Sequence, residues 1–223
     1  MTEEMVMKKN KKYEKFYTLG EEIANAVTHG VASALAIAAT VVVIVFAGIT
    51  RDPWKIVSAS IYGFSMILLY TMSTLYHSFP VGRTKAVFRV FDHASIFILI
   101  AGSYTPFTLV TLRGPIGWIL FGVTWGSAVI GVTLNAISVD RFDKLSLACY
   151  VASGWCVVFT IKPLIDKLAF NGLMFLVAGG VMYTAGIVFY KLRRKYMHSI
   201  WHVFVFLGTL FQYFCILFYV IMA

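Results

Sequence analysis

Two pairs of polar side chains in this chain are spaced four residues apart within otherwise apolar segments. Ser73 precedes His77 by four residues, and His198 precedes His202 by the same interval. Residues four apart project from one face of a helix, so each pair would present its side chains together. A fifth group, Asp92, opens another apolar segment. Polar groups at membrane depth are costly and usually functional, so these five residues indicate one chemical site.

The histidines suit a transition-metal ion. Neutral imidazoles bind zinc at about 2.0–2.1 Å, and three protein ligands with an open fourth position are typical of catalytic zinc. We therefore expect His77, His198 and His202 to hold zinc. The metal lowers the pKa of bound water to about 7, so that hydroxide forms at neutral pH. Asp92 is expected to hold or deprotonate this water, and Ser73 to donate a hydrogen bond to an oxyanion or to Asp92.

Simpler interpretations of the same residues stay open at this point. Histidines at the ends of membrane helices can serve as interfacial anchors. Asp92 can pair with Arg89 or His93, and Ser73 can be a small residue that lets two helices pack closely. His93 itself is left out of the site, because adjacent residues of a helix do not share a face.

Three more polar residues lie near the start of the first apolar segment. Glu22, Asn25 and His29 are spaced to share one helix face. They either form hydrogen bonds to a group that is bound to the metal and fix its orientation, or form hydrogen bonds between helices. The sequence supports both interpretations equally.

The elements that must position these residues are membrane helices. The chain is 60% hydrophobic and 13% charged, whereas soluble domains carry about 25% charged residues. Segments of about 20 apolar residues cross the hydrocarbon core, and they must be helical to pair their backbone groups. The predicted spans are 23–49, 54–78, 87–112, 116–137, 145–161, 169–190 and 197–221. We expect an all-α integral membrane protein, with a basic segment at 1–20 and one seven-helix transmembrane domain at 21–223.

The basic residues are distributed unequally between the two sides of the membrane. The N-terminus and the second, fourth and sixth loops carry 14 of the 19 Lys and Arg residues. The positive-inside rule therefore predicts a cytoplasmic N-terminus and a C-terminus outside, in the cell membrane. This assignment uses only Lys and Arg, yet it places His77, Asp92, His198 and His202 at one level near the cytoplasmic face. The net charge of +9 is interpreted as a topology signal and a contact for anionic lipid headgroups. Nucleic acid is not an expected partner, because no basic face of a fold is visible.

The same residues carry a resemblance to a known family. The chain resembles the bacterial hemolysin III family, the prokaryotic branch of the progestin and adipoQ receptors, and more distantly the alkaline ceramidases. The matching stretches span nearly the whole chain: Glu22-x-x-Asn25-x-x-Thr28-His29, Ser73-x-x-x-His77, Asp92-His93-x-x-Ile96, Ala101-Gly102-Ser103-Tyr104-Thr105-Pro106-Phe107 and His198-x-x-x-His202.

The resemblance implies a seven-helix fold with the N-terminus inside, and zinc held by His77, His198 and His202. It also places Asp92 and Ser73 beside the metal-bound water. In the eukaryotic receptors and ceramidases the site is tied to hydrolysis of sphingolipid amides. That substrate is not carried over to a bacterial-looking chain, since many bacteria lack ceramides.

The expected function is a zinc-dependent hydrolase that acts on lipid amide or ester bonds near the cytoplasmic face. Two alternatives stay open: a receptor-like regulator of the membrane state in which zinc is structural, and a pore-forming hemolysin, which the family name implies. The sequence indicates neither the lipid, as substrate or ligand, nor the oligomeric state.

Overall fold

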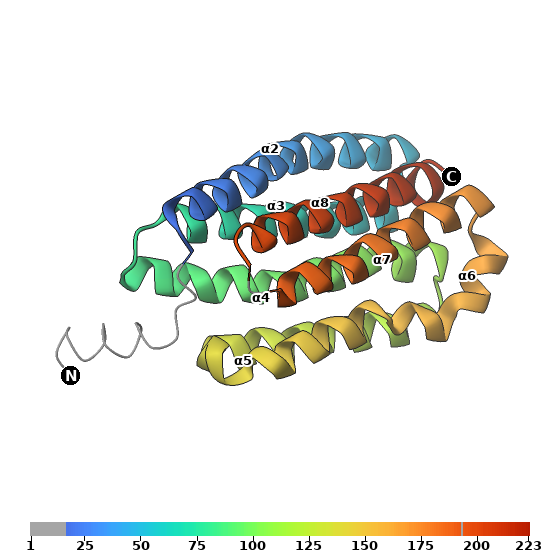
Figure 1. Cartoon of the computed structure of the whole chain (residues 1–223). Helices are drawn as coiled ribbons and strands as arrows, with labels where there is room; N and C mark the ends of the chain where they lie inside the picture. The colour runs from blue at the N-terminus through green and yellow to red at the C-terminus, as the bar shows by residue number, and fades with distance from the viewer. Residues whose placement is uncertain (1–16, 193) are drawn as a thin grey trace.

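The computed structural model is a bundle of long helices that run side by side (Figure 1). It describes residues 17–192 and 194–223, and all regular structure within this part of the chain is helical. The α-helices are α2 (Leu19–Thr50), α3 (Pro53–Ser78), α4 (Arg83–Pro106), α5 (Pro115–Gly154), α6 (Ile161–Lys167), α7 (Phe170–Lys191) and α8 (Met197–Ile216). Short π-helical segments, Phe107–Thr111 and Leu217–Ile221, and a 3-10 segment, Cys156–Thr160, extend three of them. The predicted all-α class is confirmed, and residues 1–16 of the predicted basic segment lie outside the described residues.

Six helical segments of the described chain are long and apolar enough to cross a membrane. They are Leu19–Thr50, Pro53–Ser78, Arg83–Thr111, Pro115–Lys167, Phe170–Lys191 and Met197–Ile221. Large apolar side chains such as Ile119 and Phe170 lie exposed on their outer faces. Lipid would cover such faces, whereas water would not stabilise them.

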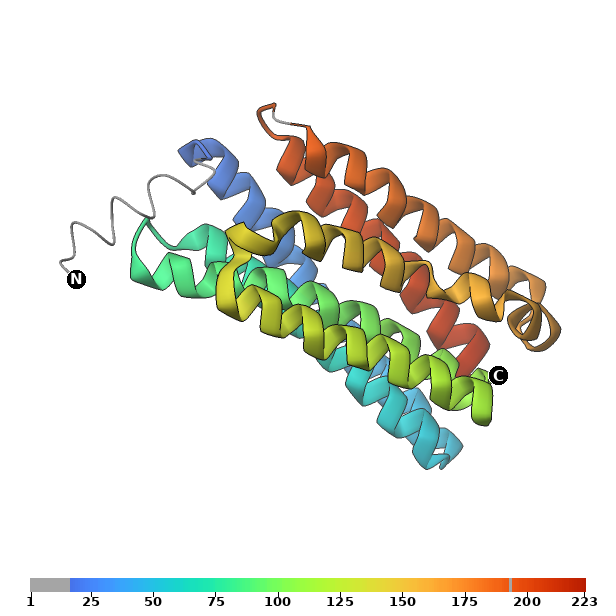
Figure 2. The same ribbon diagram turned by 90° about the horizontal axis from the view of Figure 1, so that it is seen from below.

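The longest helix, α5, turns back on itself. Ser138 has an extended backbone (φ −171°, ψ 112°) in the middle of it. The segments on either side of Ser138 pack against each other, since the hydroxyls of Ser127 and Ser153 lie 2.7 Å apart. Figure 2 shows the two arms of this hairpin running in opposite directions. The sequence predicted two separate spans here, 116–137 and 145–161, and the change of direction falls between them.

Prolines mark helix ends, although not always those that the sequence suggests. Pro53 opens α3, and Asp52 caps this helix by accepting a hydrogen bond from the Trp54 backbone N–H (2.8 Å). Pro106 ends α4, and the chain continues as a π-helical turn rather than as a kinked α-helix. Pro163 lies in the first turn of α6, where the missing N–H has no helical partner to lose. The span predicted over 145–161 therefore ends too early, because α6 continues through Pro163 to Lys167.

The starts of α2 and α8 are tied together by one carboxylate. Thr18 and Glu21 form a reciprocal capping box at the start of α2. Oε1 of Glu21 also accepts a hydrogen bond from the backbone N–H of Tyr196, the residue before α8 (3.0 Å). Because α3 ends at the same end of the bundle, Glu21 helps to bring the histidines of α3 and α8 within reach of each other.

The interior between α3 and α8 is filled by tyrosines. Tyr62 and Tyr70 of α3 are fully buried, and their hydroxyls donate to the main chain (3.3 Å) and the side chain (2.7 Å) of Thr209 in α8. Tyr183 of α7 lies 2.9 Å from the same Thr209 hydroxyl. These bonds fix the depth of α8 against α3, and with it the relative height of their histidines.

Candidate metal centre

Three histidines from two helices converge at one end of the bundle. His77 lies in the last turn of α3, and His198 and His202 lie in the first two turns of α8. One nitrogen from each ring can be chosen so that all three lie within 4.8 Å of one another. The rings of His77 and His202 are essentially buried, and that of His198 is 9% exposed. The chain thus brings together the three histidines that the sequence predicted at one membrane level.

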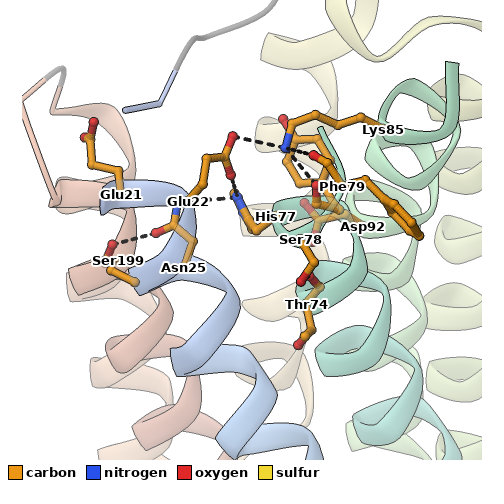
Figure 3. Close-up of polar contacts among 12 residues, drawn as sticks. Glu21, Glu22, Asn25, Thr74, His77, Ser78, Phe79, Lys85, Asp92 and Ser199 are labelled. Atoms are coloured by element: carbon orange, nitrogen blue, oxygen red, sulfur yellow. Dashed lines mark hydrogen bonds and ion pairs between the residues drawn. The ribbon is translucent and has the colours of Figure 1, made fainter. Parts of the chain in front are cut away.

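The inner nitrogens of two rings are held by neighbouring side chains of α2. Nδ1 of His77 lies 2.6 Å from Oε2 of Glu22 and 3.4 Å from the amide nitrogen of Asn25. Nδ1 of His202 lies 3.2 Å from the hydroxyl of Thr28. A carboxylate can only accept, so His77 carries its proton on Nδ1 and donates it to Glu22, and the Asn25 NH2, which is also a donor, lies beside this atom without accepting from it. Figure 3 shows Glu22 between His77 and Lys85.

The Nε2 atoms of His77 and His202 are buried and have no hydrogen-bond partner among the described residues. A buried imidazole nitrogen without a partner is costly, unless it faces a ligand. Metal-bound histidines commonly use one nitrogen for the metal and the other for a carboxylate, carbonyl or hydroxyl behind it. The observed pattern fits this arrangement, so the cluster could hold a metal ion.

The residues behind the histidines are themselves fixed. The hydroxyl of Ser199 donates to Oδ1 of Asn25 (2.5 Å), which joins α8 to α2. Oε1 of Glu22 pairs with the ammonium of Lys85 (3.0 Å), which joins α2 to α4. Besides α3 and α8, which carry the histidines, helices α2 and α4 therefore support the cluster.

His29 supports the site in a different way from Glu22 and Asn25. Its fully buried ring stacks on His202, with centroids 3.5 Å apart and planes 10° apart, and meets Tyr70 edge-on at 5.1 Å. The geometry places His29 behind a histidine of the cluster, so that it restricts the rotation of the His202 ring.

Asp92 is not part of the group of three histidines. Asp92 is buried on α4, 3.6 Å from Nδ1 of His93, and Figure 3 places it on the far side of His77 from Asn25. Arg89 forms a two-pronged ion pair with Asp140 (2.6 and 3.1 Å).

Ser73, one turn before His77, is fully buried, and its hydroxyl lacks a hydrogen-bond partner within the described chain. His93 bonds the Arg89 carbonyl (2.9 Å) and is not part of the cluster.

Sequence reasoning gave no part in the site to the aromatic residues beside the cluster, among them Tyr17. The ring centroid of Tyr17 lies 5.0 Å from that of His198 and 5.7 Å from that of His77. Burial is the main cause that raises the pKa of the Tyr17 phenol well above its usual range, so it stays protonated and able to donate. Nothing in the sequence distinguishes this tyrosine from the other 11.

Three polar supports were also missed: Thr28, Lys85 and Ser199. Thr28 stands in the motif that runs from Glu22 to His29, but the motif does not indicate a use for its hydroxyl. Lys85 was counted only as a topology charge. Ser199 follows His198 directly, so it faces away from the cluster and toward α2, where Asn25 meets it.

Comparisons with known proteins agree on one family. The family model described as "Haemolysin-III related" matches residues 17–213. "Hemolysin-3" of Bacillus cereus is 43% identical over 202 residues, which cover 90% of this chain and 92% of that protein. "Hemolysin-3 homolog" of Bacillus subtilis (strain 168) is 42% identical over 204 residues, covering 91% and 96%. The human "Monocyte to macrophage differentiation factor" is 27% identical over 206 residues, covering 89% and 84%.

Proposed function

The chain belongs to the haemolysin-III-related family, as its motifs predicted, and we propose that it is a zinc-dependent hydrolase of lipid amide or ester bonds. Its membership of this family and its long apolar helices together indicate a multi-pass protein of the cell membrane. The observation that carries the proposal is the pair of buried Nε2 atoms, on His77 and His202, whose Nδ1 atoms are already held from behind.

The proposal includes seven crossings, with the N-terminus in the cytoplasm. The α5 hairpin supports this count, because each of its arms would cross once when the helix reverses at Ser138. The excess of Lys and Arg on the N-terminal side supports the orientation. The histidine cluster then lies near the cytoplasmic face, at a depth that the carbonyl groups of lipids reach.

Zinc would be held by His77, His198 and His202, and when bound would supply Lewis acidity and a lowered pKa for water. The histidines fit this metal because imidazole is among its preferred ligands. Asp92, which is buried, would hold or deprotonate the attacking water. The Ser73 hydroxyl would donate a hydrogen bond to developing negative charge, and its lack of a partner among the described residues supports this role.

The experiment is a turnover assay of the purified, zinc-loaded protein on panels of lipid amides and esters. His202→Ala is expected to lose both metal and turnover, whereas Asp92→Ala is expected to lose turnover and keep the metal. His93→Ala serves as the metal-binding control, since His93 lies outside the cluster. A zinc-loaded wild type that hydrolyses none of these lipids would contradict the proposed activity.

A second candidate is a regulator of the membrane state in which zinc is structural. It is favoured by the position of the cluster, which joins α3 to α8 where Glu21 and Asn25 also join α2 to α8. Under this hypothesis Asp92→Ala leaves the metal content and the stability nearly intact, and chelation lowers the melting temperature sharply. An unchanged melting temperature after chelation would count against the structural role.

A pore is a weaker candidate, although the names of the two Bacillus relatives point to haemolysis. Halfway along the bundle, the hydroxyls of Tyr70 and Tyr183 both lie within hydrogen-bond distance of the buried Thr209 hydroxyl (2.7 and 2.9 Å). Polar groups satisfied in this way fasten helices together and do not line an open path for water. Leakage of dye from liposomes that contain the protein at low density would favour the pore.

A further inference from the structure

Lys85 occupies an unusual position for a lysine. It is 5% exposed and lies in the first turn of α4, where the helix dipole disfavours a positive charge. A buried ammonium without partners is strongly destabilising. Strong local interactions must therefore hold this side chain in place.

The ammonium of Lys85 has three donors and three oxygen partners. It donates to the carbonyl oxygens of Tyr76 (2.8 Å) and Phe79 (3.1 Å) and pairs with Oε1 of Glu22 (3.0 Å). It also lies 4.7 Å from the centroid of the Tyr76 ring. The two carbonyls belong to the end of α3, the negative pole of that helix. Lys85 thus caps the helix that carries His77 in its last turn.

Glu22 connects this cap to the histidine. Its carboxylate places one oxygen on Lys85 and the other on Nδ1 of His77 (2.6 Å). Without the lysine, the Glu22 side chain would be free to rotate toward water, since it is 17% exposed. The His77 ring would then lose the acceptor that fixes its tautomer and its orientation.

We propose that Lys85 is a positioning residue of the metal centre: through Glu22 it fixes the proton of His77 on Nδ1 and aims Nε2 at the metal. This inference rests on the proposed use of the cluster as a zinc site. It assigns to Lys85 an effect on metal affinity, although the lysine contacts no metal ligand itself.

The chain offers a matched control at the other end of the bundle. The ammonium of Lys55 caps a helix end in the same manner, by donating to the Ile221 carbonyl (2.9 Å) and to the O atom of Ala223 (3.3 Å). Lys55→Met and Lys85→Met both remove a lysine cap and keep an apolar stem. Only Lys85→Met also releases Glu22, so a difference in metal affinity between the variants reports positioning and not capping.

The first test needs no metal. Nitrogen NMR of the full-length, metal-free protein, labelled at histidine, reports which ring nitrogen of His77 carries the proton. The wild type and Lys55→Met are expected to show the Nδ1–H form alone, and Lys85→Met a mixture of both forms. An unmixed Nδ1–H signal in Lys85→Met would overturn the proposal, whatever the protein binds.

The second test measures the zinc dissociation constant by competition with a coloured chelator. Lys85→Met is expected to raise it roughly 10- to 100-fold, as loss of support behind a metal ligand does, and Lys55→Met to leave it unchanged. In a Glu22→Gln background Lys85→Met should have little further effect, because the connection is already broken. Equal affinities for Lys85→Met and wild type would overturn the proposal while leaving the zinc site standing, and a wild type that binds no zinc would overturn both.

If Lys85→Met does not fold, Lys85→Gln decides the question. Its amide can still donate to the carbonyls at the end of α3 but carries no charge for Glu22. A folded Lys85→Gln with weaker zinc binding supports positioning, and one with the affinity of the wild type contradicts it.

Discussion

Both ends of the bundle contain polar side chains that cap helices, but these side chains have different roles at the two ends. At the end formed by the start of α3 and the close of α8, Lys55 caps backbone oxygens, Asp52 caps α3, and Trp54 packs on Trp118 with Arg113 over its ring. These contacts finish helices and suit an interface between membrane and water. Asp52 there serves the start of its own helix, and Lys55 serves the close of α8.

At the histidine end, the polar groups serve one another. Lys85 reaches Glu22, Glu22 reaches His77, and Ser199 reaches Asn25, which stands at the same ring. Apart from the half-buried Glu22, these side chains are buried, at a cost that capping alone does not require. The contrast supports a role for these polar contacts in holding the His77 ring, so the comparison can be tested by disturbing each end in turn.

Removal of the metal is the largest expected disturbance. At a free zinc concentration 1,000 times the dissociation constant, a bound ion adds about 4 kcal/mol to the free energy of unfolding. Chelation should therefore speed hydrogen exchange at the close of α3 and the start of α8, and leave the opposite end unchanged. Equal acceleration at both ends, measured by mass spectrometry, would contradict a metal centre confined to one of them.

Glu22→Gln should have the next largest effect. The amide is nearly isosteric, but it lacks the charge that holds both Lys85 and the Nδ1 proton of His77. We expect the zinc dissociation constant to rise about 10- to 100-fold. Asp52→Asn is the matched control, because Asn caps a helix as well as Asp does and this residue lies at the other end. Similar affinities for the two variants would show that the carboxylate of Glu22 does not act on the site.

Thr28→Val should have a smaller effect at the same end. The Thr28 hydroxyl uses its proton on the backbone carbonyls of Ala24 and Asn25 (both 2.9 Å), so toward Nδ1 of His202 (3.2 Å) it acts as an acceptor. This neutral contact is weaker than the carboxylate contact of His77. We expect a rise in the dissociation constant of at most about tenfold, and recovery in Thr28→Ser, which keeps the hydroxyl. A Thr28→Ser variant as weak as Thr28→Val would assign the effect to packing.

The helices were predictable because their signal is strong and local. Long apolar segments must become helices in a bilayer, and the predicted spans agree with the helices to within a few residues for α2, α3 and α7. The α5–α6 region differed because Pro163 could open a helix as well as end one. The sequence offers no rule that chooses between these two uses of proline.

The candidate site was predictable only where spacing and charge distribution agreed. The interval of four residues linked His198 to His202, and the excess of Lys and Arg on one side placed His77 beside them. Tyr17 and Lys85 could not be found in this way. Tyrosine and lysine are common at membrane boundaries, and their contacts with the site depend on how α2, α3 and α4 pack.

The most direct test of the account is the metal content of the purified full-length protein by elemental analysis, for the wild type and for the His198→Ala/His202→Ala variant. The account predicts one zinc for each wild-type chain and none in the double variant, with both proteins folded as judged by circular dichroism. A folded wild type that contains no metal after zinc has been supplied would contradict the account, and would reduce the three histidines to polar anchors at the end of a helical bundle.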